Sequence, residues 1–163
     1  MELPNQPDSA SILRRANADD SSFIRSLSER FARVGTPGWR DPAKMEQFHQ
    51  RSGEEVCAAM GDPASLVLVA QARDGTRLGF LYVIPGTDFF TNEPQGYIAD
   101  VAVSAEAEGR GIGRKLMEQA EVWAREQGFR LLALDVFALN SHARAFYQRL
   151  GYVEETLKLV KEL

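Results

Sequence analysis

A glycine-rich segment, Gly109-Arg110-Gly111-Ile112-Gly113-Arg114, stands directly before an amphipathic run that predicts a helix. The first N–H groups of a helix have no partner within it and carry partial positive charge, so they bind anions readily. Glycine lets the backbone approach a phosphate closely, and Lys115 adds a third positive charge to those of Arg110 and Arg114. The segment therefore predicts an anion site that suits a pyrophosphate. A tight strand-to-helix turn with no ligand is the alternative that the spacing leaves open.

Two better-known phosphate motifs do not fit this spacing. A dinucleotide-binding G-x-G-x-x-G would need glycine at position 114 or 116, where Arg114 and Leu116 stand. The P-loop pattern G-x-x-x-x-G-K-[ST] is absent from the sequence. We therefore do not expect either of these nucleotide sites.

Three polar residues near the glycine segment are candidates for chemistry, and each has a structural alternative. Asp100 lies on the predicted strand before the segment, where it could be structural or simply solvated. Asn140 precedes a predicted helix and suits its N-cap position. Tyr147 lies on the apolar stripe of that helix with Phe146 and Leu150, which favours a core tyrosine.

The blocks around these residues resemble the GCN5-related N-acetyltransferase superfamily. The resemblance covers a third of the chain, from about Ile98 to Tyr152. It consists of Asp100-Val101-Ala102-Val103, then Arg110-Gly111-Ile112-Gly113, then the run Asn140-Ser-His-Ala143-Arg-Ala-Phe146-Tyr147-Gln-Arg-Leu-Gly151-Tyr152. Weaker agreement at Leu13 to Asp20 is similar to the family's first strand and helix cap.

The resemblance implies acetyl-CoA as donor and a primary amine as acceptor. It implies that backbone groups of Val101 and Val103 pair with the pantetheine arm. By the same resemblance, the N–H groups of Gly109, Arg110, Gly111, Ile112, Gly113 and Arg114 bind the pyrophosphate. Asn140 matches a position that contacts the cofactor near its thioester, and Tyr147 matches the usual general acid.

One residue departs from the family pattern. The family commonly has Gln or Arg three residues before Gly111, and this chain has Glu108. A carboxylate facing the phosphates would weaken their binding. Because most contacts of such a loop come from the backbone, we expect Glu108 to tune binding without abolishing it.

Acetyl transfer needs a neutral amine and a protonated leaving thiolate. An alkylamine has a pKa of about 10.4, so a proton acceptor matters at pH 7. Asp100 is the first candidate for this base and Glu93 a weaker one. Tyr147, with an ordinary pKa of about 10, can protonate a thiolate whose thiol has a pKa of about 8.5. We expect direct attack in a ternary complex, with a backbone N–H of residues 101–103 at the thioester carbonyl.

The order of the predicted elements indicates the fold class. Residues 97–150 read strand, glycine loop, helix, strand and helix, which implies parallel pairing, and Asp74-Gly75 predicts an earlier antiparallel hairpin. Strands are predicted at 13–16, 66–70, 78–84, 97–103 and 131–137, with one or two more in 152–163, and helices around 20–31, 43–60, 112–127 and 143–150. We expect an α/β fold: a mixed, partly antiparallel sheet of six to seven strands with helices on both faces.

Length and composition bound the class of protein. A chain of 163 residues favours one domain, over 11–163, after a flexible arm at 1–10. The net charge of -4 argues against a nucleic-acid binder. No apolar run is long enough to span a bilayer and no signal peptide is visible, so we expect a cytoplasmic protein without membrane contact. Cys57 stands alone as an expected inert thiol, and the spacing of His49 and His142 predicts no metal site.

The acceptor is the least determined part. We expect loops 35–42 and 85–96 to influence it, with Trp39, Phe89 and Phe90 either lining a pocket or packing under their own loops. A small-molecule amine and a peptide or protein amine both stay open. An exposed edge on the last strand would permit a homodimer. A non-catalytic acyl-CoA-binding regulatory module is the alternative function.

Overall fold

The computed structural model describes residues 11–30 and 34–163, which build a mixed sheet with helices packed on it. The strands of these residues are β1 (Ile12–Arg15), β2 (Leu66–Gln71), β3 (Arg77–Thr87), β4 (Pro94–Val103) and β5 (Leu132–Leu134). The α-helices are α1 (Ser21–Arg30), α2 (Pro42–Ala58), α3 (Ile112–Glu126) and α4 (Ser141–Arg149), and short 3-10 turns lie at Ala18–Asp20 and Ala105–Ala107. The predicted arm at 1–10 lies outside the described residues.

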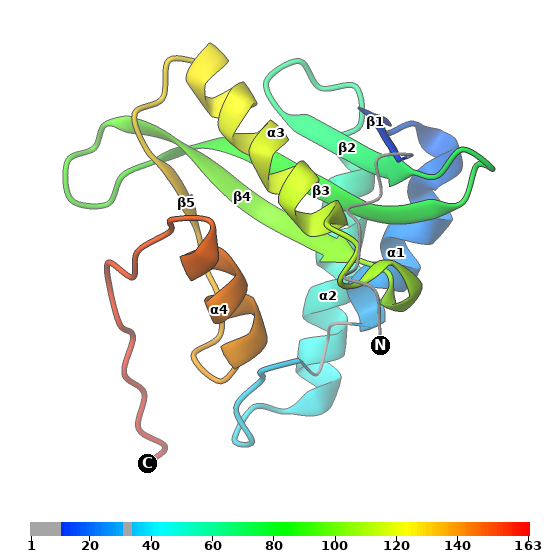
Figure 1. Cartoon of the computed structure of the whole chain (residues 1–163). Helices are drawn as coiled ribbons and strands as arrows, with labels where there is room; N and C mark the ends of the chain where they lie inside the picture. The colour runs from blue at the N-terminus through cyan, green and yellow to red at the C-terminus, as the bar shows by residue number, and fades with distance from the viewer. Residues whose placement is uncertain (1–10, 31–33) are drawn as a thin grey trace, which may run out of the picture.

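The sheet runs β1-β2-β3-β4-β5, so neighbours in sequence are neighbours in space (Figure 1). Every pair is antiparallel except β4 and β5, which are parallel and are connected through α3. The predicted hairpin at Asp74-Gly75 is confirmed, and Gly75 has the positive φ of 91° that such a turn demands. The mixed sheet and its parallel half are thus confirmed.

The predicted number of strands was wrong. The described residues form five strands, because the stretch 152–163 pairs with no other strand. A strand needs a hydrogen-bonding neighbour, and apolar character alone does not supply one. β5 is also shorter than the predicted 131–137, since its pairing with β4 ends at Leu134.

Half of the predicted loop at 85–96 is strand. β3 continues to Thr87 and β4 begins at Pro94, so only the turn 88–93 remains between them. In that turn Asp88 accepts hydrogen bonds from the backbone N–H groups of Phe90 and Thr91. Local Gly and Pro residues suggested a loop, but cross-strand pairing with a long neighbour outweighed their low strand propensity.

Helices cover both faces of the sheet, as expected. Ile24, Leu27 and Val56 of α1 and α2 pack on one face with Val67, Val69, Phe80 and Ala102. On the other face α3 packs Ile112, Leu116, Met117, Ala120, Trp123 and Ala124 against Leu66, Leu68, Leu81, Val83 and Ile98. Figure 1 shows α3 crossing in front of the sheet and α1 and α2 behind it.

A β-bulge in β4 reverses which face of the sheet the following side chains point to. Tyr82 pairs with Asp100 but the next residue, Val83, pairs with Ile98, so Ala99 is an extra residue in β4. Ile98 therefore packs on the α3 side, whereas Ala102 packs on the α1 and α2 side. The bulge follows directly after Ile98, the last residue of β4 that pairs with β5.

The chain before α1 is fixed by a buried carboxylate. We expected Asp19-Asp20 to cap the helix, but Asn17 caps the 3-10 turn and α1 begins at Ser21. The carboxylate of Asp20 is fully buried and accepts from Arg14 at 2.7 Å and from Arg77 at 2.6 Å. These guanidinium groups hold the pKa of Asp20 well below its ordinary value.

Candidate functional site

The glycine segment forms the turn into α3. Gly109 and Gly111 have positive φ angles of 75° and 81°, which side chains with a Cβ atom rarely adopt. Gly111 is the N-cap of α3 and, having no side chain, makes no side-chain cap to the first turn of the helix. This local structure fits the predicted anion site, which the 15-residue α3 would support with its dipole.

The third glycine has a packing role besides the predicted one, which stays a prediction. A Cβ atom on Gly113 would lie 3.2 Å from Cζ of Phe146, so Gly113 lets α4 pack closely against α3. Its φ is not in the positive range. At Gly113 the glycine segment therefore packs against α4, the helix that carries Tyr147. The spacing of the residues in the sequence did not predict this contact.

The cationic side chains of the segment have their own partners. Lys115 Nζ donates to Oγ of Ser11 at 2.8 Å, and Arg114 lies 3.9 Å from the carboxylate of Glu118 one turn along α3. Glu108 is exposed at the end of the 3-10 turn before the segment. The charge of Arg114 is thus partly compensated by Glu118, and Lys115 is engaged by Ser11. We therefore expect the backbone N–H groups to contribute more than these side chains to holding an anion.

β4 passes beside an opening in the sheet. Its pairing with β5 stops at Ile98 and Leu134, yet β4 continues to Val103, and no strand formed by residues 11–30 and 34–163 pairs with it on that side. The side chains of Val101 and Val103 pack toward the α3 layer. A chain-like ligand can pair with strand backbone that lacks a neighbouring strand, as an added strand would.

Asp100 faces the opposite layer from these valines. Ser52 of α2 donates to its Oδ2 at 3.3 Å. Burial raises the pKa of Asp100 to about 6, against the opposing effects of hydrogen bonds from Ser52 and from the Val101 amide. The buried hydroxyl of Ser28 adds a weaker opposing effect without reaching hydrogen-bond geometry. A carboxylate with this pKa is ionised at pH 7 and can accept a proton.

Tyr147 lies on α4, packed against Phe146 and Tyr152. Burial, and then the charge of Asp100, raise the pKa of Tyr147 to about 12. The structure thus brings Asp100 and Tyr147 within electrostatic reach although 46 residues separate them in the sequence. The predicted apolar stripe is also confirmed, because Tyr147 packs against the α3 core.

Asn140 is the N-cap of α4, and its side-chain oxygen accepts from the Ala143 N–H at 3.1 Å. A loop ahead of α2 presses on it: a Cβ atom on Gly35 would lie 2.6 Å from Cβ of Asn140. Gly35 also has a φ of 71°. The prediction that Asn140 is an N-cap is confirmed. Gly35, which the sequence indicated only as part of a turn-rich loop, packs directly against Asn140 and positions it.

Several predicted candidates lie elsewhere. Glu93 forms an exposed ion pair with Arg130 at 3.5 Å, in the turn before β4. It is seven strand residues from Asp100, about 23 Å at 3.3 Å per residue. Phe89 and Phe90, 88% and 62% exposed, occupy the same distant turn and stack edge to face. They neither line this site nor pack under their loop, so both expectations for them were wrong.

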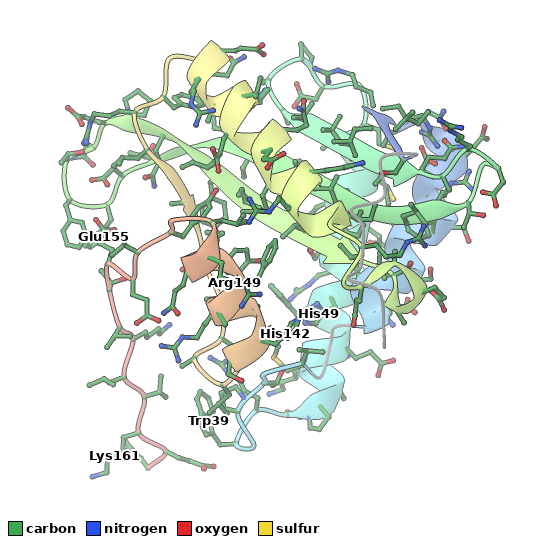
Figure 2. The ribbon with its side chains drawn as sticks, viewed as in Figure 1. Trp39, His49, His142, Arg149, Glu155 and Lys161 are labelled. Carbon is green, nitrogen blue, oxygen red and sulfur yellow. The ribbon has the colours of Figure 1, made fainter. Side chains whose placement is uncertain are left out.

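Trp39 stays near the candidate site but is not buried. It is 42% exposed, with the Arg40 guanidinium 4.5 Å from its ring centroid. Figure 2 places it at the end of the molecule where α4 and the loop before α2 meet, with His49 and His142 drawn between α2 and α4. His142 is exposed in the first turn of α4, as expected.

Sequence reasoning missed three side chains of α1 and α2 in this region. Ser28 and Ser52 approach Asp100, and His49 Nε2 is buried with no hydrogen-bond partner in the structure. Burial lowers the pKa of His49 and favours its neutral form. Such residues carry no motif, since only the packing of α2 against β4 gives them a shared site.

Two wider searches of residues 11–30 and 34–163 bear on the site. No group of three or more His, Cys, Asp or Glu side chains in this part of the chain is placed to hold a metal ion. In the same residues, no helix combines the length and apolar character needed to cross a membrane.

The geometry can serve a transfer between two bound molecules. The glycine turn into α3 and the part of β4 beyond its pairing with β5 lie on the α3 side of the sheet, the half-buried Asp100 lies on the side of α1 and α2, and Tyr147 lies within electrostatic reach of Asp100. The pyrophosphate of coenzyme A suits the glycine turn, and its pantetheine arm suits the exposed part of β4.

Comparison with known proteins bears on this arrangement. The chain matches the Acetyltransferase (GNAT) family over residues 29–152. It is 31% identical over 110 residues to an aminoglycoside N(6')-acetyltransferase type 1 of Stenotrophomonas maltophilia, covering 66% of this chain and 71% of the relative. It is 33% identical over 114 residues to a streptothricin acetyltransferase of Streptomyces lavendulae, covering 69% of this chain and 58% of that protein.

Solved structures share the fold. A putative acetyl transferase from Pyrococcus furiosus superposes with a TM-score of 0.74 at 24% identity, covering 94% of this chain and 99% of that one. AAC(6')-Iy in complex with the bisubstrate analogue CoA-S-monomethyl-acetylneamine gives a TM-score of 0.69 at 23% identity, with 95% and 99% covered. At these identities the likeness shows the fold alone. From the family match and the curated relatives, the chain belongs to the acetyltransferase (GNAT) family, whose members use acetyl-CoA, and it is an acetyltransferase enzyme.

Proposed function

We propose that this chain transfers the acetyl group of acetyl-CoA to a primary amine of a small molecule, by direct attack in a ternary complex. The observation that carries the proposal is that a half-buried carboxylate, Asp100, lies within electrostatic reach of a half-buried tyrosine, Tyr147, beside the opening between β4 and β5. The relatives named for aminoglycosides and for streptothricin support a small-molecule acceptor.

The chain's own residues fit the cofactor. Backbone N–H groups of Gly109, Gly111 and the first turn of α3 would hold the pyrophosphate, and the backbone of Val101 and Val103 would pair with the pantetheine arm. The Asn140 side chain, held against Gly35, would lie toward the thioester end. Acetyl-CoA supplies the activated acyl group.

Asp100 would accept the proton that makes the amine nucleophilic. With a pKa of about 6 it is mostly ionised at pH 7, and it is a stronger base there than an exposed aspartate. Ser52 orients the carboxylate through its hydroxyl. The nitrogen then forms its bond to the carbonyl carbon, while a backbone N–H of residues 101–103 polarises the carbonyl oxygen.

Tyr147 would protonate the departing sulfur as the carbon–sulfur bond breaks. The charge of Asp100 contributes to the raised pKa of Tyr147. When Asp100 takes up the proton of the amine, that charge is neutralised and the pKa of Tyr147 falls. Base and acid are therefore coupled: accepting the first proton makes donation of the second easier. Counted from the protonated amine, nitrogen loses two protons: the first goes to Asp100 and is later released to solvent, and the second, lost once the carbon–nitrogen bond has formed, replaces the proton that Tyr147 gives to sulfur.

The proposal is tested by mixing the protein with acetyl-CoA and a panel of amines, and measuring release of the CoA thiol and the mass of the product. We expect turnover with amino sugars or other small primary amines, and no turnover with peptide N-termini. Stabilisation by CoA without turnover of any amine would favour a non-catalytic acyl-CoA-binding module instead. Acetylation of peptides alone would overturn the small-molecule acceptor.

The acid role is tested separately with Tyr147→Phe, which keeps the ring packing. General acid catalysis contributes about 10²- to 10⁴-fold, so kcat should fall by about that factor while KM for acetyl-CoA changes little. Tyr152→Phe is the matched control, since it removes a neighbouring buried hydroxyl. Equal turnover by Tyr147→Phe and the parent would contradict the role.

A further inference from the structure

Tyr97 and Asp135 form a hydrogen-bonded pair on the two strands that border the opening between β4 and β5. The hydroxyl of Tyr97, on β4, donates to Oδ2 of Asp135 at 2.9 Å, and Asp135 is the first residue after β5. Burial, and then this hydrogen bond, raise the pKa of Tyr97 to about 12. The tyrosine therefore stays protonated at pH 7 and holds the carboxylate in place.

The alternation of side chains along β4 puts Tyr97 on the face of the sheet that carries Asp100. A Cβ atom on Gly96 would lie 3.3 Å from Cβ of Ala124 in α3, and Ile98 packs in the α3 layer. Gly96 and Ile98 therefore face α3. Tyr97 lies between them, so its side chain points to the opposite face, where α2 contacts Asp100.

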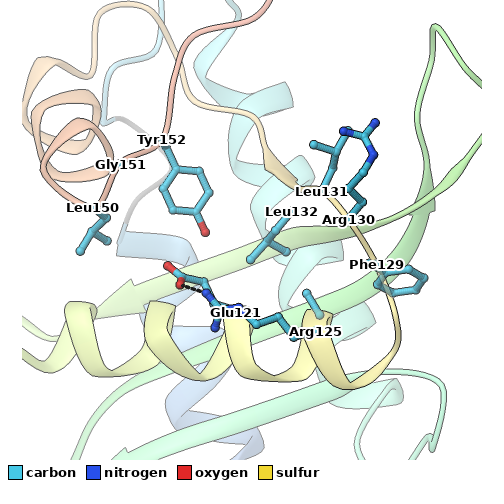
Figure 3. A pocket seen from close by; sticks show the side chains of 10 residues that line it. Glu121, Arg125, Phe129, Arg130, Leu131, Leu132, Leu150, Gly151 and Tyr152 are labelled. Atoms are coloured by element: carbon cyan, nitrogen blue, oxygen red, sulfur yellow. Dashed lines mark hydrogen bonds and ion pairs between the residues drawn. The ribbon is translucent and has the colours of Figure 1, made fainter.

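Asp135 faces the same way by the same rule. Leu132 of β5 points toward α3 and lines the pocket between α3 and β5 (Figure 3). Leu134 also packs in the α3 layer, so the next side chain, that of Asp135, points away from α3. The hydrogen bond from Tyr97 agrees with this direction. Asp135 and Asp100 therefore lie on one face of the sheet.

The two carboxylates are close neighbours on this face. Leu134 of β5 pairs with Ile98 of β4, and Asp135 and Asp100 follow directly after this pair, one and two residues later. Neighbouring strands lie about 4.8 Å apart and each residue advances about 3.3 Å, so the carboxylates are separated by about 6 to 10 Å as the strands diverge. One small molecule can therefore contact both.

Asp135 is an exposed carboxylate without a cationic partner in the protein. Within residues 11–30 and 34–163, no Lys or Arg side chain forms an ion pair with it. The exposed Glu93 and Glu154, in contrast, are each paired with an arginine. A carboxylate that is held by a tyrosine and open to solvent is a suitable acceptor for the N–H groups of an ammonium ion.

The surroundings of Asp100 hold polar atoms that the protein itself does not pair. Ser28 is 2% exposed, and its hydroxyl lies close enough to lower the pKa of Asp100, yet the described residues offer it no hydrogen-bond partner. His49, one turn before Ser52 on α2, has a buried Nε2 atom that also has no partner among them. Buried polar atoms are normally paired, so these two indicate that a polar ligand completes the site.

We propose that Asp135, held by Tyr97, is a second cation site for the acceptor, and that the acceptor carries two amino groups about 6 to 10 Å apart. One amino group reacts beside Asp100, and the other, as an ammonium ion, donates to the carboxylate of Asp135. The inference rests on the proposed function, because it names the class of amine that the transfer uses. The site selects diamines and longer polyamines over monoamines.

The second contact strengthens binding more than an isolated surface ion pair does. An exposed ion pair contributes little, because two mobile side chains must be ordered to form it. Here Tyr97 already orders Asp135, and a diamine bound at Asp100 brings its second ammonium ion to Asp135 without a further association step. A hydrogen bond to a charged group corresponds to about a tenfold to hundredfold change in affinity. Since Asp135 is exposed, we expect the lower end of that range.

The decisive experiment measures the binding of matched amines to the full chain saturated with CoA, by isothermal titration calorimetry. The probes are butylamine, pentylamine and hexylamine, and the diamines of the same carbon chains with an amino group at each end. The parent should bind at least one diamine about tenfold more tightly than the matching monoamine, beyond the statistical advantage of two equivalent ends. Asp135→Asn should abolish this preference and leave the Kd of the monoamine unchanged.

Three further variants test the arrangement of the pair. Tyr97→Phe keeps the charge of Asp135 but no longer orders it, so the preference for the diamine should fall to about threefold. Glu93→Gln removes the same charge at the far end of β4 and is the matched control, which should keep the full preference. Asp135→Lys should repel diamines and bind aminohexanoate more tightly than hexylamine. Thermal unfolding checks that each variant is folded.

Several outcomes would overturn the proposal. They are equal binding of diamines and monoamines by the parent, no measurable binding of any diamine, and a preference that Asp135→Asn leaves intact. Release of the CoA thiol from acetyl-CoA separates this proposal from the proposed function. If diamines bind through Asp135 but no amine releases thiol, acetyl transfer fails and the cation site stands. If monoamines and diamines react with equal kcat/KM and bind equally, acetyl transfer stands and the second cation site fails.

Discussion

Replacing Asp100 by Asn should stabilise the protein at high pH and disable it. In the folded protein, burial raises the pKa of Asp100 to about 6 from its ordinary value of 3.8. Its contribution to stability is therefore full below pH 3.8 and is lost as the pH rises through about 6. Ionised Asp100 thus costs free energy of folding at neutral pH, and the isosteric amide removes that cost.

The size of this free-energy cost follows from how far the pKa of Asp100 is raised. A difference of about 2.2 pKa units is about 3 kcal/mol at pH 8, where both states are ionised, at 1.36 kcal/mol per unit. At pH 5 the folded carboxyl is mostly protonated and the same linkage gives about 2 kcal/mol. The stability of Asp100→Asn relative to the parent should therefore rise by about 1 kcal/mol between pH 5 and pH 8.

Urea unfolding of parent and variant at both pH values measures this difference, with the exposed Glu106→Gln as control. CoA release measured on the same samples should fall about 10²- to 10⁴-fold for Asp100→Asn if the carboxylate is the base. A relative stability that stays constant between pH 5 and pH 8, or that falls, would refute the desolvation argument. Unchanged turnover would refute the role as base while leaving the stability argument intact.

Three further variants test the scaffold by denaturant unfolding. Asp20→Asn leaves two arginines without their buried partner and should cost about 3 to 5 kcal/mol at pH 7; because its folded pKa is depressed, the loss relative to the parent should shrink as the pH falls below 3.8. Gly35→Ala meets Asn140 at 2.6 Å with a φ of 71°, so it should cost about 1 to 3 kcal/mol and raise KM for acetyl-CoA. Gly113→Ala presses on Phe146 at 3.2 Å and should cost about 1 to 3 kcal/mol; full stability in either glycine variant would contradict the close contact.

The turn into α3 and the local structure of α3 and α4 could be predicted from the sequence because their signals are local. Positive-φ glycines at a helix start, an N-cap such as Asn140 and an apolar helical stripe act within a few residues of one another, so spacing reveals them. The parallel pairing of β4 and β5 followed from element order in the same way.

The surroundings of Asp100 were not predictable from spacing. Ser28 and Ser52 meet Asp100 only because α1 and α2 pack on β4 across long stretches of sequence. Glu93 and Phe90 were wrongly expected near the site, because they are close to β4 in sequence but lie at the end of β4 that is far from Asp100. The length of β3 and β4 was also missed, since pairing between two long strands overrides local Gly and Pro residues.

The bulge at Ala99 has a consequence for how this enzyme can diversify. One inserted residue turns the second half of β4 over, so that Asp100 looks toward the helices of the N-terminal half while Val101 and Val103 look toward α3. Substitutions on α1 and α2 can therefore reshape the surroundings of the Asp100 carboxylate without touching the glycine segment, while the charge of Asp100 still acts on Tyr147 in the layer of α3.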